Sequence, residues 1–426
     1  MKVVIKEATL SSQEENEYIA DLLLENGRIQ AIGQDLPTDG AEVVFAKGKW
    51  AIPGLVDVHV HLREPGFEKK ETIATGTLAA ARGGVTTVCA MPNLNPVPDT
   101  VGKFQQVQQK IAQDAVVHTY QYAPITKKLK SDEIVDMAAF KQAGAFAFTN
   151  DGVGVQTADV MYQAMQQAAA LHLPIVAHTE DNRLVAGGVM HEGIRNHELG
   201  LKGIPSVAES SQIARDLMLA EATGVHYHIC HISTKESVRL VRDAKRAGIH
   251  VTCEVTPHHL LLNEQDITEN HGHYKMNPPL RSVEDQQALI EGLLDGTIDC
   301  IATDHAPHQM SEKDCSIEEA AFGIVGIEDA FALLYTRFVQ SHVFTLEQLI
   351  QWMSTRPATI FGLNGGRLAV GQPADLTIVD LDTPHIIRAS DFVSKGKSSP
   401  FIGSEVYGRP VATFVSGRCV WKEQEG

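Results

Sequence analysis

The chain has 426 residues, of which 43% are hydrophobic and 21% charged, and its formal net charge is −17. This composition predicts a packed core with room for one large domain and a smaller one. The negative charge excludes nucleic acid and anionic membrane surfaces as the main partners, because the overall field repels both. No apolar run reaches the roughly 18 residues of a membrane span, and the N-terminus lacks the apolar core of a signal peptide.

The six cysteines indicate a reducing compartment. They form no CxxC pair, and four of them lie in apolar runs typical of strands. We therefore expect reduced, mostly buried thiols and a cytoplasmic protein.

From about residue 50 onward, short apolar runs alternate with amphipathic helical segments. The apolar runs lie near 50–60, 84–91, 115–122, 144–150, 173–179, 225–232, 249–256 and 297–304. Helical spacing of apolar residues follows at 71–83, 100–113, 131–143, 157–171, 206–223, 234–247, 284–294 and 326–340. Eight successive strand–helix units predict the α/β class and a (β/α)8 TIM-like barrel over residues 52–360.

Both ends of the chain differ from this repeat. Residues 1–51 and 361–426 are rich in β-forming runs that are separated by turn signals such as "ENG". We expect them to form the two parts of one small β-domain beside the barrel. The alternative is that they only close the floor of the barrel.

Polar side chains recur where the predicted strands end. The active sites of such barrels lie at the carboxyl ends of the strands, so these side chains are expected to converge. They are His59 and His61 after the first strand, Asp151 after the fourth, His178 after the fifth, His231 after the sixth and Asp304 after the eighth. Four imidazoles and two carboxylates suit Zn²⁺ or another borderline divalent ion, and six ligands suit two ions with a bridging carboxylate.

Other histidines carry a weaker signal. His228 precedes His231 by three residues and should point to the other face of its strand. His258 and His259 follow the seventh strand. For these three we expect structural or surface roles.

Two motifs in the chain resemble the signatures of a known family. "DVHVHLREP" at 57–65 and "ATDHAPHQMSEK" at 302–313 resemble the two signatures of the dihydroorotases. The whole chain, including "STRPATIFGL" before the C-terminal β-segment, resembles the amidohydrolase superfamily and is most similar to the bacterial class I dihydroorotases.

The resemblance implies how the metal ligands are shared. His59, His61 and Asp304 would hold one zinc, His178 and His231 a second zinc, and Asp151 would bridge them. Many relatives bridge the metals with a carboxylated lysine, but the segment 144–155 contains no lysine. The aspartate bridge is therefore favoured, and the second zinc is expected to bind more weakly.

The resemblance also implies a substrate site. Arg63 would bind the ring carboxylate with a bidentate fork, together with Asn93 and His308. Asn277, His61 and the backbone of Phe322 and Gly323 would contact the rest of the substrate. Taken alone, Arg63 could form a surface salt bridge, and Asn93 and Asn277 are ordinary turn residues.

The implied reaction is the reversible interconversion of N-carbamoyl-L-aspartate and (S)-dihydroorotate plus water, the third step of pyrimidine biosynthesis. A metal-bridging hydroxide would attack the ring carbonyl, with Asp304 as general base and then general acid. A homodimer is expected, and an association with aspartate transcarbamoylase is open. Residues 309–320 form either a lid or a plain surface loop.

Two rival interpretations remain at this stage. One is another cyclic amidase, such as a hydantoinase or an allantoinase, which Arg63 and the missing lysine disfavour. The other is an inactive paralogue that scaffolds a partner, which the presence of all six metal ligands disfavours.

Overall fold

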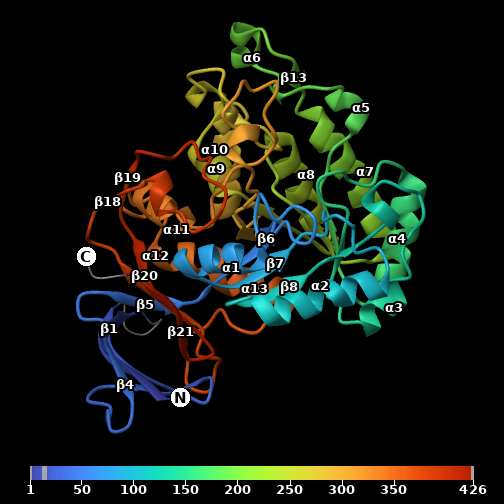
Figure 1. Ribbon diagram of the computed structural model, residues 1–426. Helices are drawn as coiled ribbons and strands as arrows, with labels where there is room; N and C mark the ends of the chain where they lie inside the picture. The colour runs from blue at the N-terminus through green and yellow to red at the C-terminus, as the bar shows by residue number, and fades with distance from the viewer. Residues whose placement is uncertain (1, 12–16, 424–426) are drawn as a thin grey trace.

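The computed structural model describes residues 2–11 and 17–423. In Figure 1 a barrel of strands and helices fills the centre and right, and a mostly antiparallel sheet lies below it at the left. Within the described residues, no helix is both long and apolar enough to cross a membrane.

Eight parallel strand positions form the barrel, and they confirm the predicted fold class. In chain order they are β6 (Leu55–Val60), β7 (Val85–Ala90), β8 (His118–Gln121) with β9 (Ala123–Pro124), β10 (Phe148–Thr149), β11 (Ile175–Ala177), β14 (Tyr227–Ile229), β15 (Val251–Val255) and β16 (Cys300–Ile301). Each pairs with the next in parallel, apart from β8 and β9, which are consecutive pieces of one strand position. A parallel bridge between Val60 and His305 closes the ring.

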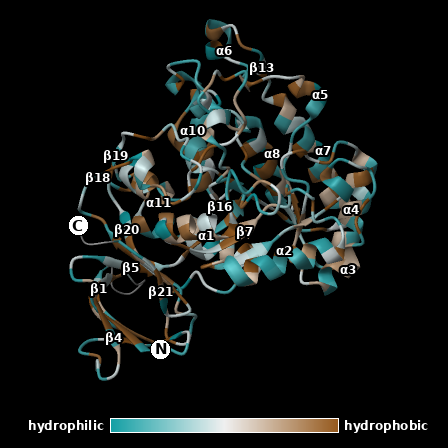
Figure 2. Ribbon diagram, viewed as in Figure 1, coloured by the Kyte–Doolittle hydropathy of each residue, from teal (hydrophilic) through white to brown (hydrophobic). Residues whose placement is uncertain are grey.

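Helices follow the barrel strands, as the repeat predicts. They are α1 (Ile73–Arg82), α2 (Val101–Asp114), α3 (Met137–Gln142), α4 (Ala158–Ala170), α7 (Val207–Thr223), α8 (Lys235–Arg246), α10 (Val283–Leu294) and α11 (Ala330–Leu334). Several begin at a hydroxyl N-cap: Thr72, Thr100, Thr234 and Ser282 each accept a hydrogen bond from the third helical N–H. Figure 2 shows apolar residues along the strands and on parts of these helices, where one large buried cluster joins the two layers.

Two predicted helices are shorter than expected. Residues 131–136 are not helical, because Ile134 forms an isolated bridge with Thr126, and Asp136 then caps α3. The helix predicted over 326–340 begins only at α11 and continues from it as a π-helical turn, η5 (Tyr335–Val339). As expected, all six cysteines are free, and Cys89, Cys230, Cys253 and Cys300 are buried.

Both chain ends contribute to a single sheet. It contains β1 (Lys2–Leu10), β2 (Tyr18–Glu25), β3 (Arg28–Gly33), β4 (Glu42–Phe45), β5 (Trp50–Pro53), β17 (Leu376–Asp380), β20 (Arg409–Val415) and β21 (Arg418–Lys422). The strand order is β21-β20-β17-β5-β1-β2-β3, and β4 also pairs with β1. The C-terminal strand β17 therefore pairs directly with the N-terminal strand β5, and a second buried cluster lies under this sheet.

The remaining elements are short and lie between or after the strands and helices already named. They are α5 (Asn182–Val185), β12 (Met190–His191), α6 (Ile194–Leu199), β13 (Gly203–Ile204), α9 (Pro257–Leu261), α12 (Leu346–Ile350), α13 (Arg356–Phe361), β18 (His385–Ile386) and β19 (Glu405–Val406). Short helical turns are η1 (Lys127–Leu129), η2 (Glu264–Asp266), η3 (Gly272–Tyr274), η4 (Met310–Glu312), η6 (Gln351–Thr355) and η7 (Ala389–Asp391).

Candidate active site

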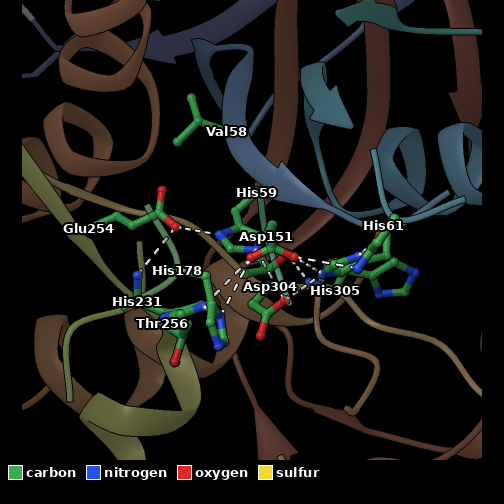
Figure 3. A network of polar contacts seen from close by, with 12 residues as sticks. Val58, His59, His61, Asp151, His178, His231, Glu254, Thr256, Asp304 and His305 are labelled. Carbon is green, nitrogen blue, oxygen red and sulfur yellow. Dashed lines mark hydrogen bonds and ion pairs between the residues drawn. The ribbon is translucent and has the colours of Figure 1, made fainter. Parts of the chain in front are cut away.

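The six predicted metal ligands converge at the carboxyl ends of the barrel strands, where Figure 3 shows them together. His59 lies within β6, and the other five follow the strands that precede them in the chain. All six are buried; they are His59, His61, Asp151, His178, His231 and Asp304. The alternation of a strand explains how the first two imidazoles reach the same side of the barrel, because residues two apart share a face.

Four of these residues form a first group around Asp304. His59 Nε2 lies 3.3 Å from Asp151 Oδ1 and 3.4 Å from Asp304 Oδ1. His61 Nε2 lies 3.0 Å from Asp304 Oδ1 and 3.5 Å from Asp151 Oδ2. Both carboxylates therefore face both imidazoles.

Two further imidazoles form a second group on the other side of Asp151. His178 Nδ1 and His231 Nε2 lie 3.0 Å apart. They lie 3.7 and 3.9 Å from Asp151 Oδ1, respectively. Asp151 is thus common to both groups, which is the position that a bridging carboxylate requires.

These spacings fit a divalent metal centre. Two ligands bound at about 2.1 Å to one tetrahedral ion lie roughly 3.4 Å apart, which is close to the observed separations. His59 Nε2 and Asp151 Oδ1 are buried and have no hydrogen-bond partner, although buried polar atoms are normally satisfied. A cation held between them would satisfy both atoms.

The charges of the site favour the same interpretation. Burial disfavours a charge on His59, but the Asp151 and Glu254 carboxylates outweigh it and hold the pKa of this imidazole well above its usual value. Burial also opposes ionisation of Asp151, yet His59 and His61 hold the pKa of that carboxyl well below its usual value. The carboxylates therefore stabilise positive charge at this position, and a metal can replace the proton.

Glu254 is a site residue that the sequence reasoning missed. It lies in β15, is 1% exposed, and its Oε1 lies 2.6 Å from His59 Nδ1. Its Oε2 lies 3.2 Å from His228 Nε2. Because the carboxylate accepts the Nδ1 proton, it directs Nε2 of His59 toward the other ligands. The available signal was a single carboxylate in a short strand with no other charged residue.

Asn93 orients the second imidazole of the first motif. Its Oδ1 lies 2.9 Å from His61 Nδ1, and its Nδ2 lies 3.5 Å from Asp151 Oδ2. Since the amide oxygen can only accept, Nδ1 of His61 carries the proton and Nε2 is left free for a metal. The residue predicted to contact substrate thus also contacts two predicted ligands.

Arg63 lies beside the metal-ligand cluster with its guanidinium largely unengaged. Its Nε donates to the Pro307 carbonyl at 3.3 Å, and one Nη lies 3.3 Å from His308 Nε2. In the described chain, no carboxylate lies within 4.0 Å of it. His308 Nε2 lies 2.8 Å from the Phe322 carbonyl, which can only accept, so this nitrogen carries the proton and cannot accept from Arg63. Arg63 therefore keeps donors for an anion.

The remaining predicted substrate contacts lie on two adjacent loops. Asn277 Nδ2 donates to Glu180 Oε2 at 2.7 Å, so its Oδ1 faces away from that carboxylate. Gly323 N donates to the Lys275 carbonyl at 3.0 Å. The structure brings Asn277 near His178 through Glu180, whose Oε2 lies 3.9 Å from His178 Nε2.

Three of the clustered residues have left-handed backbones. The φ angles of Arg63, His231 and Asp304 are 61°, 31° and 48°. Such conformations are uncommon for residues other than glycine, and they concentrate at functional sites. The turn after each strand thus helps to direct its side chain into the cluster.

Comparisons with known sequences agree with this geometry. A family described as "Dihydro-orotase-like" matches residues 48–237, and one described as "Amidohydrolase family" matches residues 146–421. A dihydroorotase from Enterococcus faecalis is 59% identical over 425 residues and covers 100% of both chains. A dihydroorotase from Listeria innocua is 58% identical over 405 residues and covers 95% of both.

Solved structures share the same architecture. An L-hydantoinase (dihydropyrimidinase) from Arthrobacter aurescens has a TM-score of 0.89 at 29% identity, over 99% of this chain and 96% of its own. A D-hydantoinase (dihydropyrimidinase) from Thermus sp. has a TM-score of 0.85 at 27% identity, over 99% of this chain and 97% of its own. The fold is therefore that of the amidohydrolase barrels with an added sheet, and by its sequence the chain belongs to the dihydroorotase family.

Proposed function

We propose that the chain is a zinc-dependent dihydroorotase, which interconverts (S)-dihydroorotate plus water and N-carbamoyl-L-aspartate in the third step of pyrimidine biosynthesis. The dihydroorotase relatives support the reaction class. The imidazole and carboxylate ligand set supports zinc, and two His/Asp groups that share Asp151 support two ions. The homodimer and an association with aspartate transcarbamoylase stay predictions.

The observation that carries this proposal is the free guanidinium of Arg63 next to the ligand cluster. Dihydroorotate differs from the neutral ring dihydrouracil by one carboxylate. A guanidinium without an acidic partner provides a bidentate site for that carboxylate. A site for neutral rings has no need of such a cation, because a neutral ring offers no carboxylate to pair with it.

The residues of the chain divide the chemical work among them. A divalent metal held by the six clustered histidines and aspartates would supply an acidified water and a Lewis acid. Asp304 is ionised, because His59 and His61 outweigh the effect of burial and lower the pKa of its carboxyl. It can therefore accept a proton from the attacking water and return it to the ring nitrogen as the carbon–nitrogen bond breaks. Arg63 holds the ring carboxylate so that the reacting carbonyl stays beside Asp304.

Turnover of (S)-dihydroorotate and dihydrouracil by the wild type and by Arg63→Met tests the substrate. We expect the wild type to prefer dihydroorotate, and Arg63→Met to lose about 10²-fold or more in kcat/KM for that ring alone. Zinc should be counted in the same samples and should not change, because Arg63 binds no metal.

Arg242→Met is the matched control for this experiment, because Arg242 pairs with Asp295 on the surface of the barrel. It should behave as the wild type does with both rings. Preference of the wild type for dihydrouracil would contradict the proposal and would favour the hydantoinase alternative, which the structural likeness to hydantoinases also raises.

A further inference from the structure

Lys313 ends the second sequence motif, and neither the metal centre nor the reaction uses it. Its side chain is fully buried, at 0% exposure. No carboxylate in residues 2–11 or 17–423 lies within 4.0 Å of its ammonium group. Its Nζ instead donates to two backbone carbonyls, that of Lys275 at 2.9 Å and that of Ala321 at 2.8 Å.

These two carbonyls belong to the two loops that carry predicted substrate contacts. Lys275 lies two residues before Asn277, and Ala321 directly precedes Phe322 and Gly323. The Lys275 carbonyl also accepts from Gly323 N at 3.0 Å, so the loops meet at this one oxygen. Lys313 therefore links both loops through its amine.

The loop that contains Lys313 is tied to its surroundings elsewhere as well. Ile317 N donates to Asn270 Oδ1 at 2.8 Å, and Gly272 N donates to the Cys315 carbonyl at 2.8 Å. The approach is so close that a Cβ on Gly272 would lie 2.4 Å from the Lys313 carbonyl oxygen. The position of Lys313 is thus determined by its own loop, and the amine is fixed relative to the two carbonyls.

An amine suits this position because its N–H groups can donate to both carbonyls at once. Burial, and then the charge of Lys275, lower the pKa of Lys313 to about 7. Either protonation state has enough N–H donors for the two carbonyls, because the ammonium has three and the neutral amine has two. An apolar side chain of the same length would leave both carbonyls without this donor, and unpaired buried polar groups are destabilising.

We propose that Lys313 is a positioning residue for substrate binding, which holds the backbone at 321–323 and the loop of Asn277 in register with each other. This inference rests on the proposed function. It assigns Lys313 no contact with the substrate or the metal ligands. Its loss should therefore weaken substrate binding, whereas metal content and the chemical step should change little.

Steady-state kinetics with (S)-dihydroorotate on the metal-loaded full chain test the proposal. For Lys313→Met we expect KM to rise about tenfold while kcat stays within about threefold, since only uniform binding is lost. For Lys313→Gln, whose uncharged amide restores two N–H donors on a shorter side chain, we expect a rise of only about threefold. Lys141→Met is the control, because Lys141 also donates to a carbonyl, that of Leu171, but on the exposed surface.

Each outcome decides the proposal. An unchanged KM in Lys313→Met, or equal losses in the Met and Gln variants, overturns it. Lower metal content in Lys313→Met also overturns it, because the residue would then support the metal site. If Lys313→Met is insoluble, Lys313→Gln decides: a raised KM with unchanged metal supports the role, and a wild-type KM overturns it. Failure of the wild type to open dihydroorotate overturns the proposed function together with this one.

Discussion

Replacement of Asp304 by asparagine should lower kcat for dihydroorotate by about 10³-fold or more, because the proposed general base and acid would be lost together with one proposed metal contact. The carboxylate faces both His59 Nε2 and His61 Nε2, and its lowered pKa keeps it ionised, which is the form that can accept a proton. The measurement is kcat at saturating substrate and saturating zinc, with bound metal counted in each sample.

Asp314→Asn is the control for that experiment. Asp314 directly follows Lys313 and is an exposed carboxylate that pairs with His271. It should leave kcat unchanged. An Asp304→Asn protein that retains both its metal and a kcat near that of the wild type would show that another group moves the proton.

Replacement of Glu254 by glutamine should weaken metal binding by about 10- to 100-fold, which is the usual effect of removing a carboxylate behind a ligating imidazole. The pKa of Glu254 is lowered to about 2, since His59 and His228 outweigh the effect of burial, and so the native group is an anion. A neutral amide lacks this charge, and its NH₂ group would face His228 or the backbone N–H of His231. Competition with a chelator measures the metal affinity directly.

Glu264→Gln provides the matched control, because Glu264 is also buried but accepts from the backbone N–H groups of Ile194 and Arg195, away from the cluster. It should bind metal as the wild type does. If Glu254→Gln also binds metal with wild-type affinity, the orientation of His59 does not depend on Glu254.

Much of the fold and the convergence of the six predicted ligands could be predicted because both follow from local periodicity. Strand runs and helical spacing located the repeat, and the strand ends then placed His59 and Asp304 at one end of the barrel. The helix boundaries differed mainly in the segment before Asp136, where Ile134 bridges to Thr126, a residue on another segment, instead of joining the helix. The resemblance of the motifs supplied the roles that periodicity could not.

Glu254 and Lys313 could not be predicted in the same way, because their partners are distant in sequence. Glu254 meets His59 across the barrel interior, 195 residues away. The partners of Lys313 are backbone carbonyls, and every residue has one, so the residue types in the sequence do not reveal them. In both cases the sequence shows only a charged residue, and burial, which makes each of them informative, appears only in three dimensions.

The pairing of β5 with β17 has a consequence for how the protein is made. Trp50–Pro53 leaves the ribosome long before Leu376–Asp380, and the entire barrel is synthesised between these two strands. The sheet can therefore be completed only near the end of translation, after the barrel has had time to form. Until then, one edge of the nascent N-terminal strands has no partner, and the growing chain depends on its own final segment to cover it.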